Sequence, residues 1–142
     1  MKTCFALITL LFTTAAWASS IPRQPETCPS VAAITQSSFT VAQKSTDGSY
    51  GTLMLDNFGT QEMWGFVIAE VMANSPQDAL AKAKDSLNSL TFLAGPSYYS
   101  SNNLWGCFYS VDAGYPVLAL TPLPSQGRSV ANGLGLEILN KL

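Results

Sequence analysis

The sequence has 142 residues, nine acidic and seven basic side chains and a net charge of −2, which suits a single domain. Its Lys and Arg residues are scattered and form no basic cluster. This excludes a nucleic-acid-binding protein and a protein held on anionic lipid by a basic face. The absence of histidine removes the base of Ser–His–Asp and Cys–His enzymes and the histidine ligands of metal sites. We therefore expect no enzyme, no catalytic residue and no metal site.

The first 18 residues have the pattern of a secretion signal. Lys2 supplies the positive end, and an apolar run extends from Cys4 to Ala16. This run of about 13 residues is too short to span a hydrocarbon core of about 30 Å. Small residues then predict cleavage between Ala18 and Ser19.

Cleavage would leave one domain, residues 19–142, with a net charge of −3. Cys4 stands at the start of the apolar run, whereas the acylated cysteine of a lipoprotein follows it, so we expect no membrane anchor. In the alternative, the apolar run is a buried first helix, but the proline-bearing segment after it favours a signal. The expected location is periplasmic or secreted.

Two cysteines, Cys28 and Cys107, remain after cleavage. An even number of cysteines in an exported chain favours a disulfide. The loop it closes would contribute about 4–5 kcal/mol to stability on chain-entropy grounds. The alternative is a pair of free thiols, which is disfavoured because no histidine is present to lower a thiol pKa.

The N-terminal half predicts an extended segment followed by strands. Residues 19–27, with two prolines, predict an extended leader, and Cys28–Ile34 a short turn of helix. Alternation predicts a strand over Phe39–Lys44 and a return strand over Tyr50–Leu55. Trp64–Ala73 is apolar on both faces, which is typical of a central, covered strand.

The next segment predicts one amphipathic helix and a hairpin. Ser75 has the character of an N-cap, with proline next and an acid three residues later, so a helix should cover Pro76–Leu90. Pro96–Asn103 predicts a polar loop. Trp105–Val111 and Tyr115–Leu120 then predict two paired strands.

Residues 127–142 form a weakly specified tail that begins at Gly127 and carries several leucines and two further glycines. The element order predicts an α+β fold: a two-layer domain in which one helix packs on an antiparallel sheet of four or five strands, closed by one disulfide.

Two groups of residues have chemical potential. Glu62 and Glu70 flank the Trp64 strand, and a carboxylate pair is what a glycosidase needs, although solvent-facing glutamates explain them more simply. Tyr98 and Tyr99 lie in the predicted polar loop among serines and an asparagine. Adjacent loop tyrosines are typical of a binding surface, so we select them as candidate ligand-binding residues.

Several motifs occur together in this chain: Ala16-Trp17-Ala18, Cys28, the Trp64 strand, Ser75-Pro76-Gln77-Asp78-Ala79-Leu80, Trp105-Gly106-Cys107-Phe108-Tyr109 and Gly114-Tyr115. In these motifs the chain resembles small exported proteins of Legionella-type bacteria, some of which are described as hemin-binding. The resemblance implies an exported protein that binds hemin. A competing expectation is a non-enzymatic protein-interaction module, such as an inhibitor or a host-directed factor.

If the ligand is haem, a chain without histidine must offer another axial ligand. Tyr98 or Tyr99 is the first choice. The weaker choices are Met54, Met63 and Met72. We expect an apolar slot for the porphyrin ring to be lined by Phe58, Trp64 or Trp105. Lys44 or Arg128 would then lie near the propionates.

Overall fold

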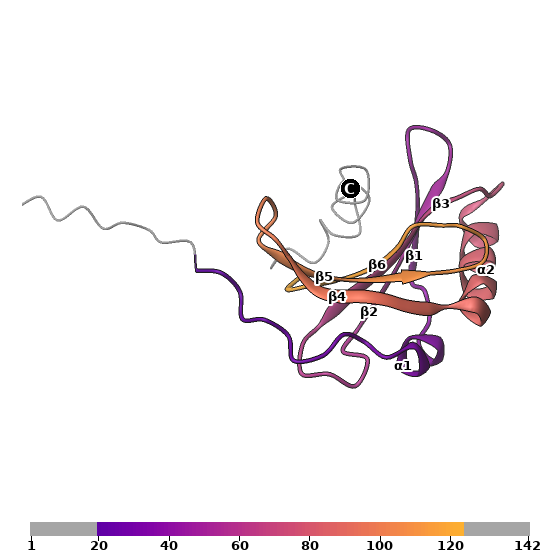
Figure 1. Ribbon diagram of the computed structural model, residues 1–142. Coiled ribbons are helices and arrows are strands. Elements are labelled where there is room, and N and C mark those ends of the chain that lie inside the picture. The colour runs from indigo at the N-terminus through magenta and orange to yellow at the C-terminus, as the bar shows by residue number, and fades with distance from the viewer. Residues whose placement is uncertain (1–19, 124–142) are drawn as a thin grey trace, which may run out of the picture.

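The computed structural model describes residues 20–123. The predicted signal segment 1–18 with its cleavage bond before Ser19, and the predicted tail 127–142, lie outside the described residues. Six strands form one antiparallel sheet in the order β1-β2-β3-β6-β5-β4 (Figure 1). The strands are β1 (Val41–Lys44), β2 (Tyr50–Asp56), β3 (Trp64–Val71), β4 (Thr91–Tyr99), β5 (Leu104–Ser110) and β6 (Val117–Thr121). The predicted α+β class is confirmed, with six strands in place of four or five.

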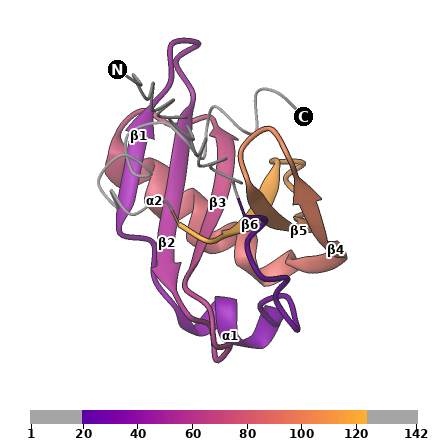
Figure 2. The ribbon, with the colours of Figure 1, turned by 90° about the vertical axis from the view of Figure 1, so that its left-hand side faces the viewer.

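The sheet consists of two three-stranded meanders, β1-β2-β3 and β4-β5-β6, connected by helix α2 (Pro76–Ser86). The halves join because β6 pairs with β3, with Gly65 opposite Leu120 (Figure 2). The predicted central position of the Trp64 strand is therefore confirmed. Strands β2 and β6 flank it, and its apolar residues are buried on both faces, with Phe66 in the main core and Val67 in a smaller cluster on the other side of the sheet.

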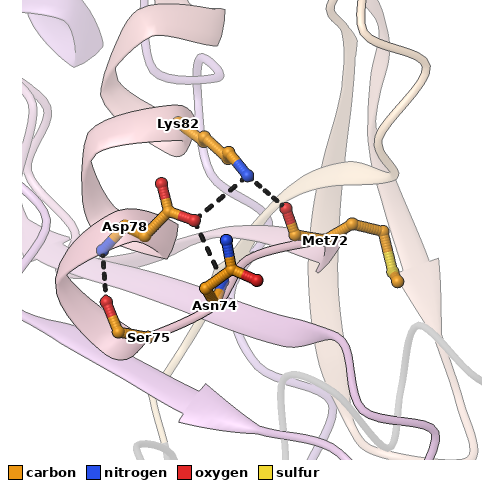
Figure 3. A network of polar contacts seen from close by, with 5 residues as sticks. All are labelled: Met72, Asn74, Ser75, Asp78 and Lys82. Atoms are coloured by element: carbon orange, nitrogen blue, oxygen red, sulfur yellow. Dashed lines mark hydrogen bonds and ion pairs between the residues drawn. The ribbon is translucent and has the colours of Figure 1, made fainter.

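Helix α2 begins with the predicted cap. The Asp78 N–H donates to Ser75 Oγ at 3.1 Å, which satisfies one of the free donors of the first turn. The Asp78 carboxylate accepts from the Asn74 N–H at 2.9 Å and lies 3.1 Å from Lys82 Nζ. Lys82 also donates to the Met72 carbonyl at 2.8 Å (Figure 3). This network fixes the turn between β3 and α2.

The predicted helix is longer than the observed one. Helix α2 ends at Ser86, and a 3₁₀ turn, η1 (Leu87–Ser89), follows it. The Ser86 hydroxyl donates to the Ala83 carbonyl at 2.7 Å, so this buried side chain bonds to its own backbone. Leu87 and Leu90 are nevertheless buried in the core, as a continued apolar face requires.

The core lies between the sheet and a layer made of α2 and the short helix α1 (Val31–Gln36). Phe66 of β3 is fully buried and lies at its centre, in edge contact with Phe58 and Tyr109. Ile34 of α1 and Ala83 of α2 belong to the same cluster. The two helices therefore share one core.

Strand β4 is the element that the sequence did not predict. The predicted loop over Pro96–Asn103 is wrong for residues 96–99, which continue the strand. β4 is an edge strand, and residues 91–95 are all exposed, so it shows no alternation of apolar and polar residues. Its register with β5 shifts twice between Phe92 and Ser97, and an edge position tolerates Pro96 because no neighbour needs its missing N–H.

Candidate functional site

Strand β5 holds an N-terminal strap, residues 20–30, against the sheet. Alternate residues of a strand point to the same face, so three side chains of β5 reach the strap in turn. These contacts are the Trp105 Nε1–H donating to the Pro22 carbonyl at 2.9 Å, the Cys28–Cys107 disulfide, and the Tyr109 hydroxyl donating to the Pro29 carbonyl at 2.6 Å. The predicted disulfide is confirmed, and it lies at the centre of this row.

The N-terminal strap is part of the folded body. Pro25 and Pro29 are fully buried, and Cys28 is half-buried. Burial also raises the pKa of Tyr109, so its hydroxyl remains a proton donor to the strap in alkaline solution. The strap is thus an extended segment that packs against the sheet.

A cleft of about 400 Å³ lies between the strap and β4. Its lining is mostly apolar or backbone, and the residues are Glu26, Thr27, Cys28, Pro29, Ser30, Val31, Phe92, Gly95 and Pro96. The Phe92 ring packs edge-on against Tyr109, with 5.5 Å between ring centroids, although 45% of its surface is exposed. One wall of the cleft is therefore the Phe92 ring, which Tyr109 supports on one side.

Gly95 allows β4 to pass close to the disulfide. A Cβ at this position would lie 2.9 Å from the Cys107 Cα and 3.1 Å from the Cys28 Sγ, and its φ of +132° disfavours any other residue. Gly95 consequently lines the cleft with bare backbone close to the disulfide.

Tyr98 lies on the same face of the sheet as the strap. It pairs with Trp105, and the two rings pack with centroids 5.1 Å apart. Its hydroxyl donates to Asn103 Oδ1 at 2.6 Å on the exposed surface. Asn103 has a φ of +55°, a conformation that asparagine tolerates better than most residues. The phenol oxygen is therefore held at the exposed surface by Asn103.

Tyr99 points to the opposite face. Its ring packs against Phe108 with centroids 6.0 Å apart, and it occupies the space that a side chain at Gly106 would need. Burial raises the pKa of its hydroxyl. The two candidate tyrosines lie at the end of a strand and not in a loop, so the structure does not bring them together at one site.

The other residues selected for a haem slot lie elsewhere. Phe58 and Trp64 are buried in the core, and Trp105 is half-buried under Tyr98. Lys44 lies on β1, at the opposite edge of the sheet from β4, and Arg128 is outside the described residues. The expected slot lined by Phe58 or Trp64 is therefore filled by the core itself.

The methionines are also dispersed. Met54 is buried in the core on β2. Met63 and Met72 have exposed side chains and lie just before and just after β3, at its two ends. A strand of this length spans on the order of 20 Å or more, so these two side chains do not face one ligand.

The two glutamates of the possible carboxylate pair are separated in the same way. Glu62 precedes β3 and lines a second, smaller hollow of about 230 Å³ together with Glu26. Glu70 lies near the far end of β3, where its side chain is exposed. The intervening strand is on the order of 20 Å long, whereas glycosidase carboxylates lie roughly 5–10 Å apart. Their positions do not suit a shared reaction.

Within residues 20–123, no three His, Cys, Asp or Glu side chains gather in a group that could hold a metal ion. Nor does this part of the chain contain a helix with the length and apolar character needed to cross a bilayer. Comparison of the chain with protein-family models, with curated proteins and with solved structures found no match. The functional assignment therefore depends on the chemistry of the cleft and its surroundings.

Proposed function

We propose that this chain is a small exported ligand-binding protein without enzymatic activity, and that its ligand occupies the cleft between the N-terminal strap and β4. The observation that carries this proposal is a cleft of about 400 Å³ whose outer wall is covalently attached to the sheet. Small-molecule sites are typically about 300–1,000 Å³ and mainly apolar. A preformed wall also reduces the entropy lost on binding.

Export is supported by the disulfide between Cys28 and Cys107. Disulfides persist in oxidising compartments such as the periplasm or the extracellular space and are rare in the cytosol. The apolar run and cleavage pattern of the first 18 residues support the same location.

Hemin is the ligand that we propose to test first. It combines a flat apolar ring, carboxylates and an iron that accepts a tyrosine oxygen. The apolar walls at Pro29, Phe92 and Pro96 suit the ring. Tyr98 does not line the cleft, but it lies two residues beyond Pro96 on the same strand and offers a phenol oxygen on the same face of the sheet. Arg23 of the strap, 3.4 Å from Glu26 at the rim of the cleft, offers a guanidinium to a carboxylate.

The test is a hemin titration of the oxidised mature protein, followed by its Soret absorbance. The proposal predicts a saturable change with one hemin per chain. Tyr98→Phe should alter the spectrum of the complex, because it removes the proposed iron ligand. Tyr99→Phe is the matched control, since it removes the same atom from the opposite face, and should leave the spectrum unchanged. Absence of saturation in the folded protein would exclude hemin.

A protein partner is the second candidate function, and exposed apolar residues on β4 favour it. Phe92 and Leu93 are 45% and 60% exposed at adjacent positions on this edge strand. Addition of a partner strand is disfavoured because Pro96 and two register shifts interrupt the edge. Such a partner would instead insert side chains beside the cleft.

Leu93→Ser distinguishes the two functions because Leu93 does not line the cleft. Hemin affinity should be unchanged in this variant if the cleft is the site. A partner recovered with the unmodified protein but lost with Leu93→Ser, in the absence of saturable hemin binding, would favour the interaction module.

A further inference from the structure

The face of the sheet turned away from α2 is also apolar. We call it the second face, and its buried side chains are Leu53, Val67, Leu104, Leu118 and Leu120. An antiparallel sheet with one face in water normally places polar residues on that face. This sequence therefore demands a second covering layer.

The centre of the second face is excluded from solvent. Leu118 is 0% exposed and Leu53 is 5% exposed. The helices and the N-terminal strap of the described chain belong to the other face, since Ile34 and Ala83 are in the core with Phe66 and the strap is bonded to β5 on that side. Among residues 20–123, the partial cover comes from Tyr99, Phe108 and Leu123.

Leu123 shows where the missing cover begins. It is the last described residue, and it packs against the cluster of Leu53 and Val67 on the second face. A Cβ at Gly65 would lie 2.9 Å from the Leu123 Cδ2, so the glycine leaves space for this side chain. The chain thus leaves the described region while lying on the second face.

We infer that residues 124–142 bind across the second face and form its covering layer. These 19 residues follow Leu123 directly, and their apolar members are Val130, Ala131, Leu134, Leu136, Ile138, Leu139 and Leu142. The distance from β2 to β5 is three strand spacings, or about 14 Å. Even as a helix, the last 13 residues would extend about 20 Å, which is enough to cross it.

Photo-crosslinking in the full mature chain tests this assignment. The half-buried Phe108 on the second face is replaced by p-benzoylphenylalanine, and the irradiated, reduced protein is digested with trypsin. We expect an intramolecular crosslink to the peptide Ser129–Lys141, which trypsin releases after Arg128. Leu55, which is 39% exposed beside Gly65, gives a second position that tolerates replacement.

The matched control places the same probe at Phe92, on the opposite face, where no crosslink to Ser129–Lys141 is expected. Crosslinks from Phe108 and Leu55 to a second copy of the chain, or the absence of any crosslink to the tail peptide, would overturn the inference. A second measurement uses the variant with Leu134, Leu136, Ile138 and Leu139 changed to Ser. It should unfold at a lower denaturant concentration than the unmodified chain, and an unchanged midpoint would also contradict the inference.

Discussion

The Tyr109 hydroxyl donates a buried 2.6 Å hydrogen bond to the carbonyl oxygen of Pro29, 80 residues earlier in the chain. With the disulfide two residues before it, this bond fixes the N-terminal strap over β5. The cleft exists because the strap is held there while β4 passes beside it. Stability of the strap and shape of the proposed site are therefore coupled.

Tyr109→Phe should lower the free energy of unfolding by about 1–3 kcal/mol, because it leaves the buried Pro29 carbonyl without its donor. Tyr98→Phe is a matched control: its hydroxyl makes a bond of the same 2.6 Å length to Asn103, but on the exposed surface. We expect a loss of about 0.5 kcal/mol or less there. Urea unfolding curves measure both losses of unfolding free energy. Equal losses would show that the buried bond to the strap stabilises the fold no more than the exposed bond to Asn103.

Removal of the disulfide should destabilise the protein and disrupt the cleft. The Cys28→Ala, Cys107→Ala double variant should lose about 4–5 kcal/mol on chain-entropy grounds, and its hemin affinity should fall because one wall is released. Unfolding curves with and without reductant measure the effect. The reductant should shift the unmodified protein and leave the double variant unchanged. Equal stability of the unmodified protein and the double variant in the absence of reductant would contradict the prediction.

Gly95→Ala should be more destabilising than Gly48→Ala. Both glycines have positive φ, so each substitution costs about 1–2 kcal/mol of backbone strain. Only Gly95 also meets fixed backbone atoms, with the Cys107 Cα 2.9 Å from the new Cβ, whereas nothing lies within 4 Å of the new Cβ at Gly48. The crowding should add about 1–3 kcal/mol. Thermal or urea unfolding measures the difference, and similar losses would show that β4 moves away freely.

Acid should weaken the turn between β3 and α2. The Asn74 N–H and Lys82 hold the pKa of Asp78 below its ordinary value of 3.8. Because the pKa of Asp78 is lower in the folded state, its carboxylate contributes its full stabilisation at pH values above the ordinary pKa of 3.8. That stabilisation is lost as the pH falls through the folded-state pKa. Unfolding free energies measured from neutral pH to about pH 2 should therefore fall more steeply for the unmodified protein than for Asp78→Asn.

The control for this experiment is Asp85→Asn, which removes the same charge from the same helix without touching the Asn74 or Lys82 contacts. Asp78→Asn should be the less stable protein at neutral pH and should approach the unmodified protein in acid. If the unfolding free energies of the unmodified protein and Asp78→Asn ran parallel over the whole pH range, the Asp78 carboxylate would not be the source of the acid sensitivity.

Local patterns predicted much of the fold. The cap at Ser75 follows from residue types at fixed spacing, the central strand beginning at Trp64 from an apolar pattern on both faces, and the disulfide from an even number of cysteines in an exported chain. The structure contains each of them. Strand β4 was missed because an exposed edge strand has no alternation, and Pro96 is usually a sign of a loop.

The site was harder to predict because it joins segments far apart in the chain. The sequence predicts the strand over Trp105–Val111, but no local pattern shows that Trp105, Cys107 and Tyr109 have their partners in the N-terminal strap. Tyr98 and Tyr99 were grouped as adjacent loop residues, whereas a strand directs neighbouring side chains to opposite faces. Their separation depends on the unpredicted strand.

The position of the ligand is tested most directly by amide NMR spectra of the oxidised, ¹⁵N-labelled mature protein during a hemin titration. The cleft proposal predicts saturable changes, reaching completion at one hemin per chain, at the amide signals of the non-proline residues in 26–31 and 92–98. Signals from β1 should remain unaffected, because β1 forms the opposite edge of the sheet. Saturable changes confined to β1 and β2, or no saturable change at all, would contradict it.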